Sequence, residues 1–460
     1  MSAYVGYPEY RDSGVEWLGE VPCDWSPIPI KYMALTRESL FLDGDWIESK
    51  DIAGTEIRYI TTGNVAEGFY REQGAGFISE EKFVELGCTE VWRGDVLISR
   101  LNPPIGRACV VPELGSRIVT SVDNVIFRPD SYIKRRYLVY LFSSAEYFHH
   151  TSNLARGATM QRISRGLLGN IRVELPTTVE QSRIANFLDH ETAKIDTLIE
   201  KQQQLIKLLK EKRQAMISHA VTKGLNPDAP MKGSGVEWLG EVPEGWVVCK
   251  IKNVANIESG HTPSRQIEKY WENCHIPWVS LNDSRWLKSN DYIEETKYKI
   301  SDLGMANSSA RLLPERCVLF TRDASIGLSA ITTKPMAVSQ HIIAWIVDSE
   351  KIVPEFLLFV FYAMEEELDK ATFGATIKTI GMDDVRSLVA AFPSVPEQEG
   401  IVEHVFRELS HLDRHAESAQ LAISLLKERR TALISAAVTG KIDVRNWQPS
   451  KSDSTTSTDA

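Results

Sequence analysis

The sequence contains no run of 18 or more apolar residues, and its polar first residues carry no secretory signal. It has only six cysteines, and none of them stands in CxxC spacing. We expect reduced thiols in a cytoplasmic protein, not disulfides or a zinc site. No GxxxxGK(S/T) loop and no glycine-rich cofactor loop after a strand is present, so the sequence predicts neither an ATPase nor a cofactor-dependent enzyme.

The sequence also lacks an excess of positive charge, since its formal net charge is -10. Phosphate binding needs local positive charge, so a nucleic-acid binder of this composition would need a basic patch or basic partners. Two stretches are locally basic. Residues 156–183 hold five arginines against two glutamates, and residues 201–213 hold five lysines and arginines against one glutamate. These stretches predict a basic stripe that could follow phosphates.

What the sequence does contain is a repeat. Ten residues from Ser13 to Pro22 recur unchanged from Ser234 to Pro243, and residues 157–222 match residues 374–439 at 24 of 66 positions without a gap. Residues 40–95 have no convincing partner in the second half. The predicted organisation is therefore two diverged bodies and two repeated arms with a disordered tail: bodies at 1–177 and 225–394, arms at 178–224 and 395–442, and the tail at 443–460.

The repeated arms have the pattern of long helices. Residues 180–221 contain neither Pro nor Gly, and apolar residues recur at alternating spacings of four and three, which indicates a coiled coil. An arm of roughly 42 residues would reach about 60 Å. Each arm has one apolar seam, so its simplest partner is the other arm. If the two arms pair antiparallel, a pseudo-two-fold axis relates the halves. The predicted seam residues are Leu188, Ile195, Ile199, Ile206, Leu209, Leu409, Leu412, Ile423, Leu426 and Leu433.

Arg213 and Arg430 fall at equivalent positions of this seam. Their heads either reach water or a carboxylate while their stems pack, or they fix the register of the two helices.

Two variable bodies that alternate with two repeated helical arms resemble the specificity subunits of type I restriction-modification systems. The likeness includes GVEWLGEVP at the head of each half, the segment Gly94 to Arg100 followed by Ile105-Gly106, Gly-Ala-Thr at 157–159 and 374–376, and Glu-Gln at 180–181 and 397–398. The resemblance implies an α+β fold, with two mixed α/β target-recognition domains in tandem repeat, separated by two long helices that form an antiparallel coiled coil.

The resemblance also implies a function. Each target-recognition domain would read one half of a bipartite site on double-stranded DNA, while the arms set the unread spacer and dock two methyltransferase subunits. Those partners would methylate adenine with S-adenosylmethionine, and restriction/translocase subunits would use ATP and Mg²⁺ to cleave unmodified foreign DNA. The chain itself is expected to be a cytoplasmic, non-catalytic subunit that binds no cofactor, no metal and no membrane.

Candidate DNA-reading residues are those that can present hydrogen-bonding groups to bases from loops flanked by strand-like runs. Arginine suits guanine, and asparagine or glutamine suits adenine. The candidates are Asn64, Arg100, Asn102, Arg156, Gln161, Arg162, Arg165, Asn282, Arg285, Arg322, Gln340 and Lys378.

Two motifs suggest other chemistry. Residues 102–105, Asn-Pro-Pro-Ile, nearly match the Asn-Pro-Pro-aromatic motif of adenine N6-methyltransferases, but Ile replaces the aromatic residue that stacks on the flipped base. A loop beside DNA explains the segment better. His411 and His415 have i, i+4 spacing without a third metal ligand, which favours a solvated face.

The alternatives for the function of the chain are a standalone adenine methyltransferase and a structural coiled-coil protein whose two heads bind ligands other than DNA.

Overall fold

The computed structural model describes residues 4–74, 76–374 and 378–449. The chain forms two compact units. Unit 1 comprises Met1–Gln202 with Leu421–Ala460, and unit 2 comprises Gln203–Gln420. Each unit therefore contains one body together with part of each long helix. Within the described residues, no helix is long and apolar enough to cross a membrane.

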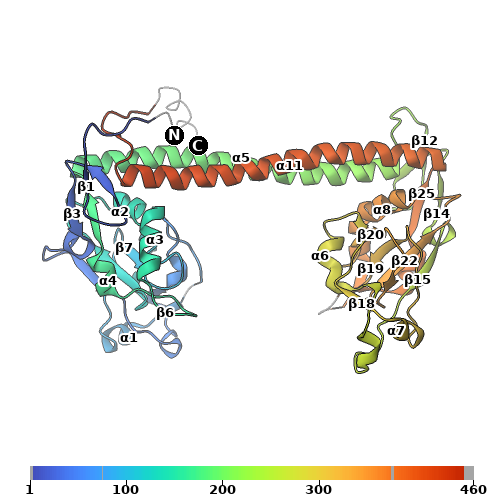
Figure 1. Ribbon diagram of the computed structural model, residues 1–460, viewed down its shortest axis with the longest axis horizontal. Helices are drawn as coiled ribbons and strands as arrows, with labels where there is room; N and C mark the ends of the chain where they lie inside the picture. The colour runs from blue at the N-terminus through green and yellow to red at the C-terminus, as the bar shows by residue number, and fades with distance from the viewer. Residues whose placement is uncertain (1–3, 75, 375–377, 450–460) are drawn as a thin grey trace. The chain divides into compact units, whose positions relative to one another are not determined.

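The two repeated arms are the long helices α5 (Thr178–Lys223) and α11 (Val395–Val438) (Figure 1). α5 begins where the Thr177 hydroxyl accepts a hydrogen bond from the Glu180 amide at 3.3 Å. It ends before Gly224, whose φ of 73° is the left-handed conformation that glycine adopts most easily after a helix.

The two helices pack against each other in antiparallel orientation within each unit. In unit 1, Leu188 near the start of α5 and Ala437 near the end of α11 belong to one buried cluster. In unit 2, Ala220 near the end of α5 and Val405 near the start of α11 share another. The predicted coiled coil is confirmed. The predicted seam residues are placed as follows: Leu188, Ile195, Leu409, Leu412, Ile423 and Leu433 are buried, and Ile199, Ile206, Leu209 and Leu426 are half-buried.

The two seam arginines each pair with a carboxylate of the opposite helix. In unit 2 the Arg213 Nη1 atom lies 2.8 Å from Asp413 Oδ1, and in unit 1 the Arg430 Nε atom lies 3.0 Å from Asp196 Oδ1. Arg213 and Asp196 correspond to Arg430 and Asp413 at the repeat offset of 217 residues. The sequence left open whether these arginines reach water or a carboxylate, or fix the register of the helices. The structure shows that both arginines reach a carboxylate, and the equivalent ion pair occurs in both units.

The body of unit 1 contains two main sheets. An antiparallel sheet has the order β4-β10-β7-β8, and a second sheet has the order β6-β5-β9, in which β5 and β9 are parallel. The strands are β4 (Leu40–Asp43), β5 (Ile57–Ile60), β6 (Gly76–Ile78), β7 (Val96–Ser99), β8 (Ala108–Val110), β9 (Arg117–Thr120) and β10 (Asn124–Arg128). Two strand pairs complete it: β1 (Tyr10–Asp12) with β2 (Glu20–Pro22), and β3 (Ser26–Pro29) with β11 (Arg172–Leu175). Its helices are α1 (Glu80–Glu85), α2 (Arg135–Leu141), α3 (Ala145–Leu154) and α4 (Arg165–Asn170).

The body of unit 2 repeats this topology. The order β15-β22-β19-β20 corresponds to the first sheet of unit 1, with β17 added at the edge, and the order β18-β16-β21 corresponds to the second. The strands are β15 (Ala255–Ser259), β16 (Ile276–Val279), β17 (Tyr292–Ile293), β18 (Tyr298–Ile300), β19 (Val318–Thr321), β20 (Ser329–Thr332), β21 (Ala337–Val338) and β22 (Ile342–Val347). Three strand pairs accompany them: β12 (Met231–Gly233) with β13 (Glu241–Pro243), β14 (Val247–Lys250) with β25 (Val389–Phe392), and β23 (Thr372–Phe373) with β24 (Thr379–Ile380). The helices are α6 (Ser284–Leu287), α7 (Asp302–Ala306), α8 (Pro354–Ala363), α9 (Glu365–Lys370) and α10 (Met382–Ser387).

The central strand of each main sheet is buried on both faces, which explains its continuous apolar sequence. Successive side chains of a strand point to opposite faces. In β7, Val96 and Ile98 therefore join the cluster that includes the long helices, while Leu97 joins the cluster that includes the second sheet. In β19, Phe320 and Leu319 divide in the same way.

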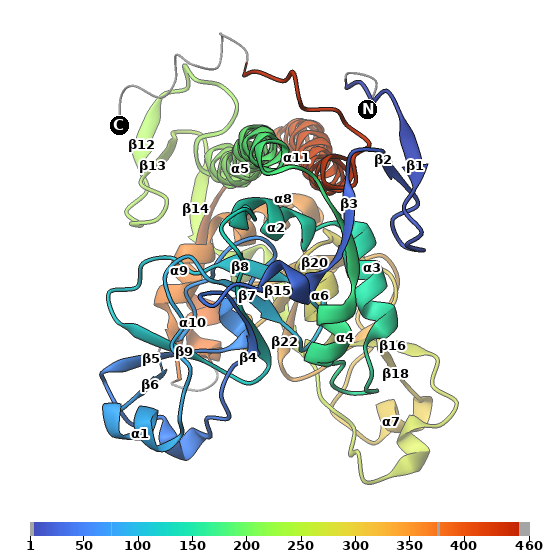
Figure 2. The same ribbon diagram turned by 90° about the vertical axis from the view of Figure 1, so that its left-hand side faces the viewer.

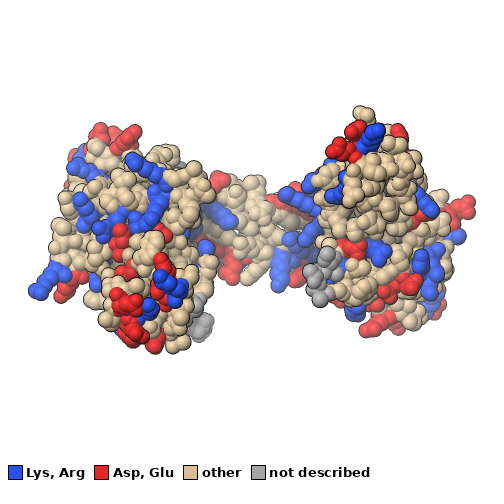
Figure 3. Space-filling model, turned by 90° about the horizontal axis from the view of Figure 1, so that it is seen from below, with Lys and Arg blue, Asp and Glu red and all other residues tan. Residues whose placement is uncertain are grey.

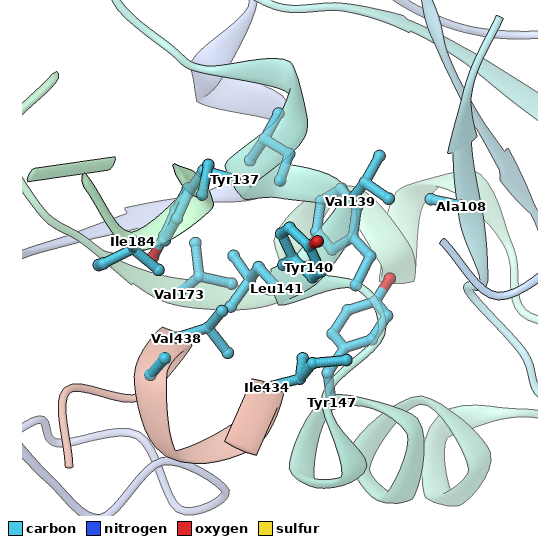
Figure 4. Close-up of a cluster of buried hydrophobic side chains, with 14 of the residues drawn as sticks. Ala108, Tyr137, Val139, Tyr140, Leu141, Tyr147, Val173, Ile184, Ile434 and Val438 are labelled. Carbon is cyan, nitrogen blue, oxygen red and sulfur yellow. The ribbon is translucent and has the colours of Figure 1, made fainter. Parts of the chain in front are cut away.

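One helix of each body lies between the main sheet and the long helices, as Figure 2 shows for α2. Figure 4 shows Tyr137, Leu141, Ile184, Ile434 and Val438 of α2, α5 and α11 meeting in one apolar cluster. The body is thus joined to the helix pair by a continuous core.

The repeated Glu-Gln motif fixes this junction. The buried Gln181 side chain accepts from the Lys134 amide at 2.8 Å and donates to the Pro176 carbonyl at 3.0 Å. Gln398 makes the equivalent bonds with the Val353 amide at 2.8 Å and the Pro393 carbonyl at 3.0 Å. The repeated residues thus hold a body to a helix.

The preceding glutamates bind tryptophans that follow the repeated GVEWLGEVP segments. Glu180 accepts from Trp25 at 3.2 Å, and Glu397 accepts from Trp246 at 3.0 Å. These bonds tie the start of each half to its arm.

The segment after α11 differs from its prediction as a disordered tail. Residues 443–449 are described and pack in unit 1: Val444 is buried, Trp447 contacts Phe187 edge-on, and the Asp443 amide donates to the Val5 carbonyl at 2.8 Å. The predicted boundary at residue 443 came from the end of the repeated arm, and it lies too early because this segment gains its order from burial against α5. The remainder of the predicted tail, 450–460, lies outside the described residues.

Candidate nucleic-acid interface

Two loops meet at the end of the central strand in each unit, and we call them the loop pair. In unit 1 the loop after β7, residues 100–106, joins residues 156–163. In unit 2 the loop after β19, residues 322–327, joins residues 378–380, the described part of its partner. Ala375 and Thr376 of the second Gly-Ala-Thr motif lie outside the described residues.

The same backbone hydrogen bonds hold both loop pairs. In unit 1 the Asn102 amide donates to the Gln161 carbonyl at 2.9 Å, and in unit 2 the Ala324 amide donates to the Lys378 carbonyl at 2.9 Å. Asn102 and Ala324 share a left-handed conformation, with φ of 58° and 65°. The Ile163 amide donates to the Arg100 carbonyl and the Ile380 amide to the Arg322 carbonyl, each at 3.0 Å. The two backbones are therefore equivalent although their side chains differ.

The loop pair of unit 1 gathers most of the candidate residues of the first body. Asn102, Arg156, Gln161 and Arg162 are exposed, and Arg165 is half-buried. Within the described residues, the side chains of Asn102, Arg156 and Gln161 make no hydrogen bond or ion pair. These three polar groups are thus available to a ligand.

Two other arginines of this loop pair already have carboxylate partners. Arg162 lies 3.0 Å from Asp123, and Arg165 lies 3.8 Å from Asp43. Part of their charge is therefore neutralised before any phosphate approaches.

Arg100 is a structural residue, in disagreement with its prediction as a base-reading one. Its side chain is buried, and its guanidinium donates to the carbonyls of Ile163 and Val122 and pairs with Asp43 at 3.1 Å. Burial lowers the pKa of Arg100, and the Asp43 carboxylate opposes this shift. These bonds hold the guanidinium inside the protein, although its Nε atom has no hydrogen-bond partner among the described residues, so it cannot reach a base edge.

Its equivalent in unit 2, Arg322, has a different environment. The register of the sheets places Ser259 where unit 1 has Asp43, so no carboxylate occupies this position. The Arg322 Nε atom is buried and has no hydrogen-bond partner among the described residues, and the side chain as a whole is half-buried. The Nε atom lacks a partner in both units. The difference is that two carbonyls and Asp43 hold the Arg100 guanidinium, whereas no hydrogen bond or ion pair holds the Arg322 side chain among the described residues.

Asn64 is also structural rather than available for reading. It is 3 % exposed, its carbonyl oxygen accepts from the Thr61 amide at 3.0 Å, and its amide group donates to the carbonyls of Arg71 and Gln73 at 3.1 and 2.9 Å. An asparagine after a strand is typical both of a turn and of a binding loop, and here the turn uses every bond.

The remaining candidates of unit 2 lie on exposed surfaces. Asn282 and Arg285 are exposed around α6, and the one side-chain contact of Asn282 with a described residue is with the Ser280 hydroxyl, at 3.4 Å. Lys378 lies 3.2 Å from Asp369 in an exposed ion pair. Gln340 is exposed beside the loop pair, since the neighbouring His341 carbonyl accepts from the Arg322 amide at 3.0 Å.

Sequence reasoning missed Arg107, which shapes the Asn-Pro-Pro segment. Its guanidinium donates to the carbonyls of Asn102 at 2.7 Å, Val65 at 2.7 Å and Thr62 at 3.0 Å. The bonds hold the backbone on which Asn102 is carried. No local pattern marks such a residue, because its acceptors are backbone groups from a distant segment.

Acidic and basic side chains are interspersed on both bodies, as the view in Figure 3 shows. The arginines of the predicted basic stripe do not lie together on one surface. Arg156, Arg162 and Arg165 lie at the loop pair, whereas Arg183 on α5 donates to the Arg445 carbonyl at 2.6 Å. Positive charge at this interface is local, in agreement with a net charge of -10.

Within the described residues, no group of three or more His, Cys, Asp or Glu side chains could hold a metal ion. His411 and His415 are exposed, and His411 lies 2.8 Å from Arg414 on the same helix. In the Asn-Pro-Pro-Ile segment Ile105 is 1 % exposed, so no side chain at that position can stack on a base.

The known proteins that resemble this chain belong to one family. Residues 41–208 and 243–419 match the family described as type I restriction modification DNA specificity domain. The MjaIX specificity subunit of Methanocaldococcus jannaschii is 22% identical over 463 residues, with 95% of this chain and 97% of the relative covered. The EcoKI specificity subunit of Escherichia coli K12 is 21% identical, with 71% and 70% covered.

Two solved structures share the fold. A chain from a study of complex assembly and conformational transition of the type I R-M system has a TM-score of 0.69 at 17% identity, covering 92% of this chain and 99% of that one. The HsdS subunit from Thermoanaerobacter tengcongensis has a TM-score of 0.54 at 17% identity, with 92% and 98% covered.

Proposed function

Because the chain belongs to the type I restriction-modification DNA specificity family, with two copies of the family's domain, we propose that each loop pair reads one half of a bipartite DNA site. The chain is the non-catalytic specificity subunit of its system, and its partners are DNA and the methyltransferase and restriction subunits. The residues proposed to read or position DNA are Asn102, Arg156, Gln161, Arg162 and Arg165 in unit 1, and Asn282, Arg285, Arg322, Gln340 and Lys378 in unit 2.

The observation that carries this proposal is the equivalence of the two loop pairs. Their backbones are held by the same hydrogen bonds, yet Asn102, Gln161 and Arg162 of unit 1 correspond to Ala324, Lys378 and Thr379 of unit 2. The frame is thus kept, while the exposed polar groups that it carries are exchanged. Two readers of different sequences need one supported frame with different hydrogen-bonding groups.

The long helices are proposed as the docking surface of the methyltransferase subunits. Leu198, Leu421 and Leu425 in unit 1 are 45%, 61% and 55% exposed, and Leu205 and Leu208 in unit 2 are 41% and 61% exposed. These leucines lie outside the seam that joins α5 to α11. Such apolar side chains on a helical surface are typical of an interface with another protein.

No cofactor is proposed for this chain. S-adenosylmethionine, ATP and Mg²⁺ belong to the partner subunits in this proposal, and the cytoplasm is the compartment where such a complex meets DNA.

Binding selections with randomised duplex DNA test the proposal. The chain would be purified alone and with its methyltransferase subunits, and bound DNA would be sequenced after selection at two salt concentrations. We expect the complex to select a split motif with a fixed gap, with affinity that falls as salt rises. The isolated chain should bind more weakly, because its own positive charge is local. Selection of one continuous motif, or of none, would contradict the proposal.

A further inference from the structure

Gln340 is held in a single orientation by a chain of hydrogen bonds in unit 2. The Thr262 hydroxyl donates to Gln340 Oε1 at 2.5 Å, and Gln340 Nε2 lies 3.1 Å from His341 Nε2. His341 Nδ1 lies 2.6 Å from Asp323 Oδ2, and the Thr379 hydroxyl donates to Asp323 Oδ1 at 2.6 Å. The network joins both loops of the loop pair, through Asp323 and Thr379, to the segment before β22.

The direction of each bond follows from the chemistry of these groups. An ionised carboxylate only accepts, so the His341 Nδ1 atom donates to Asp323. In a neutral imidazole the other ring nitrogen is then an acceptor, and Gln340 Nε2 donates to it. At the opposite end of the amide, the Thr262 hydroxyl donates to Gln340 Oε1. If the oxygen and nitrogen of the Gln340 amide were exchanged, the oxygen would face the acceptor nitrogen of His341 and that hydrogen bond would be lost, so the contact with His341 sets the direction of the amide.

The held amide keeps one hydrogen-bonding position free on each of its polar atoms. The amide nitrogen has a second N–H, and the carbonyl oxygen has a second lone pair. One donor and one acceptor side by side form the pattern that pairs with adenine in the major groove, where N7 accepts and the N6 amino group donates. Gln340 is exposed, so this edge is accessible to DNA.

The first unit offers an internal comparison. Asp123 occupies the position of His341, since the Arg100 amide donates to the Asp123 carbonyl at 2.8 Å as the Arg322 amide does to His341. There the two segments are joined by a direct ion pair between Arg162 and Asp123 at 3.0 Å. The residue equivalent to Gln340 is Val122, which has no polar side chain. At these two equivalent positions, unit 2 has an imidazole and a side-chain amide, and unit 1 has neither.

We propose that Gln340 recognises an adenine in the half-site read by unit 2, and that Asp323 and His341 are positioning residues that set the direction of its amide. The proposal rests on the proposed function, because it assigns a base to one side chain of a DNA-reading surface. Its specific content is the chemical identity of that base and the dependence of its recognition on the Asp323–His341 pair.

The test uses the complex of the full chain with its methyltransferase subunits and the same selection from randomised DNA. We expect Gln340→Ala to reduce the preference for adenine at one position of one half-site by roughly 10-fold to 100-fold, the discrimination expected of one bidentate contact. Gln340→Glu replaces the donor by an acceptor, so the preferred base at that position should move from adenine towards cytosine, whose N4 amino group donates. Asp323→Asn should weaken discrimination at the same position and at no other.

Three controls keep the outcomes distinct. Gln266→Ala changes another exposed glutamine of unit 2 and should leave the motif unchanged. The half-site of unit 1 should be unaffected in every variant, and the unfolding midpoint of Gln340→Ala should equal that of the wild type. A wild-type complex that selects no split motif would contradict the proposed function itself. A split motif that Gln340→Ala leaves unchanged, or alters at a base other than adenine, would overturn this inference alone.

Discussion

Replacement of Gln398 by leucine should loosen the attachment of the second body to the long helices. The buried Gln398 side chain accepts from the Val353 amide at 2.8 Å and donates to the carbonyls of Lys351 at 2.9 Å and Pro393 at 3.0 Å. Leucine preserves most of the volume and removes all three bonds. At about 0.5–1.5 kcal/mol for each bond, the free energy of unfolding of unit 2 should fall by roughly 2–4 kcal/mol.

The equivalent residue of unit 1 provides the matched control. Gln181 makes two of these bonds, to the Lys134 amide and the Pro176 carbonyl. Gln181→Leu should therefore lower the stability of unit 1 by less, roughly 1–3 kcal/mol. A chain with two compact units does not guarantee a two-state transition, so local stability is the better measurement.

Hydrogen–deuterium exchange measures it directly. In Gln398→Leu, amides of α8 should exchange faster by the factor that corresponds to the lost free energy, while α2 keeps its wild-type rate. In Gln181→Leu the affected helix should be α2. Unchanged exchange of α8 in Gln398→Leu would refute the argument that this side chain joins body to helix.

Three further predictions follow from single contacts. Arg100→Met should destabilise unit 1 by roughly 2–4 kcal/mol, because carbonyls and a carboxylate lose a buried partner, yet leave the selected motif unchanged; a changed motif would show that Arg100 reads DNA. A double-mutant cycle on Arg213 and Asp413 should give a coupling of about 0.2–1 kcal/mol that shrinks in high salt, since the pair is exposed; a coupling that is insensitive to salt would contradict this. Arg156→Gln should weaken binding to all sequences alike and reduce the slope of log K against log salt by about 1, which titrations at several salt concentrations would reveal; loss at one base only would argue for base contact.

The large-scale architecture could be predicted because its signals are long. The spacing of Leu188, Ile195 and Leu433 is a pattern sustained over many residues, and the repeat showed that the same arm occurs twice. Pairing of the arms followed from the need of each arm to bury one seam, and the antiparallel direction followed from the resemblance to the specificity subunits.

The shared topology of the bodies could not be predicted in the same way. Residues 40–95 have no matching sequence in the second half, yet β5 and β16 occupy the same place in equivalent sheets. A strand requires only alternating burial, which many sequences satisfy, so topology persists after identity is lost.

The candidate site residues could likewise be predicted only in part. Exposed Asn102 and Gln161 were found because loops at strand ends are accessible, whereas Asn64 and Arg100 have the same sequence context and are buried. The difference lies in partners distant along the chain, such as Asp43 for Arg100. The bond between Asp323 and His341 was missed for the same reason.

The length of the helices tests the account most directly. Seven residues that continue the seam would be inserted after Gln202 in α5 and after Gln420 in α11, which keeps the heptad pattern. Each helix then lengthens by about 10.5 Å at 1.5 Å per residue, which is about 3 base pairs of B-DNA. Sequencing of the DNA selected by the methyltransferase complex should show both half-sites unchanged and the gap about 3 base pairs longer. An unchanged gap, or altered half-sites with the original gap, would contradict the claim that these helices set the distance between two readers.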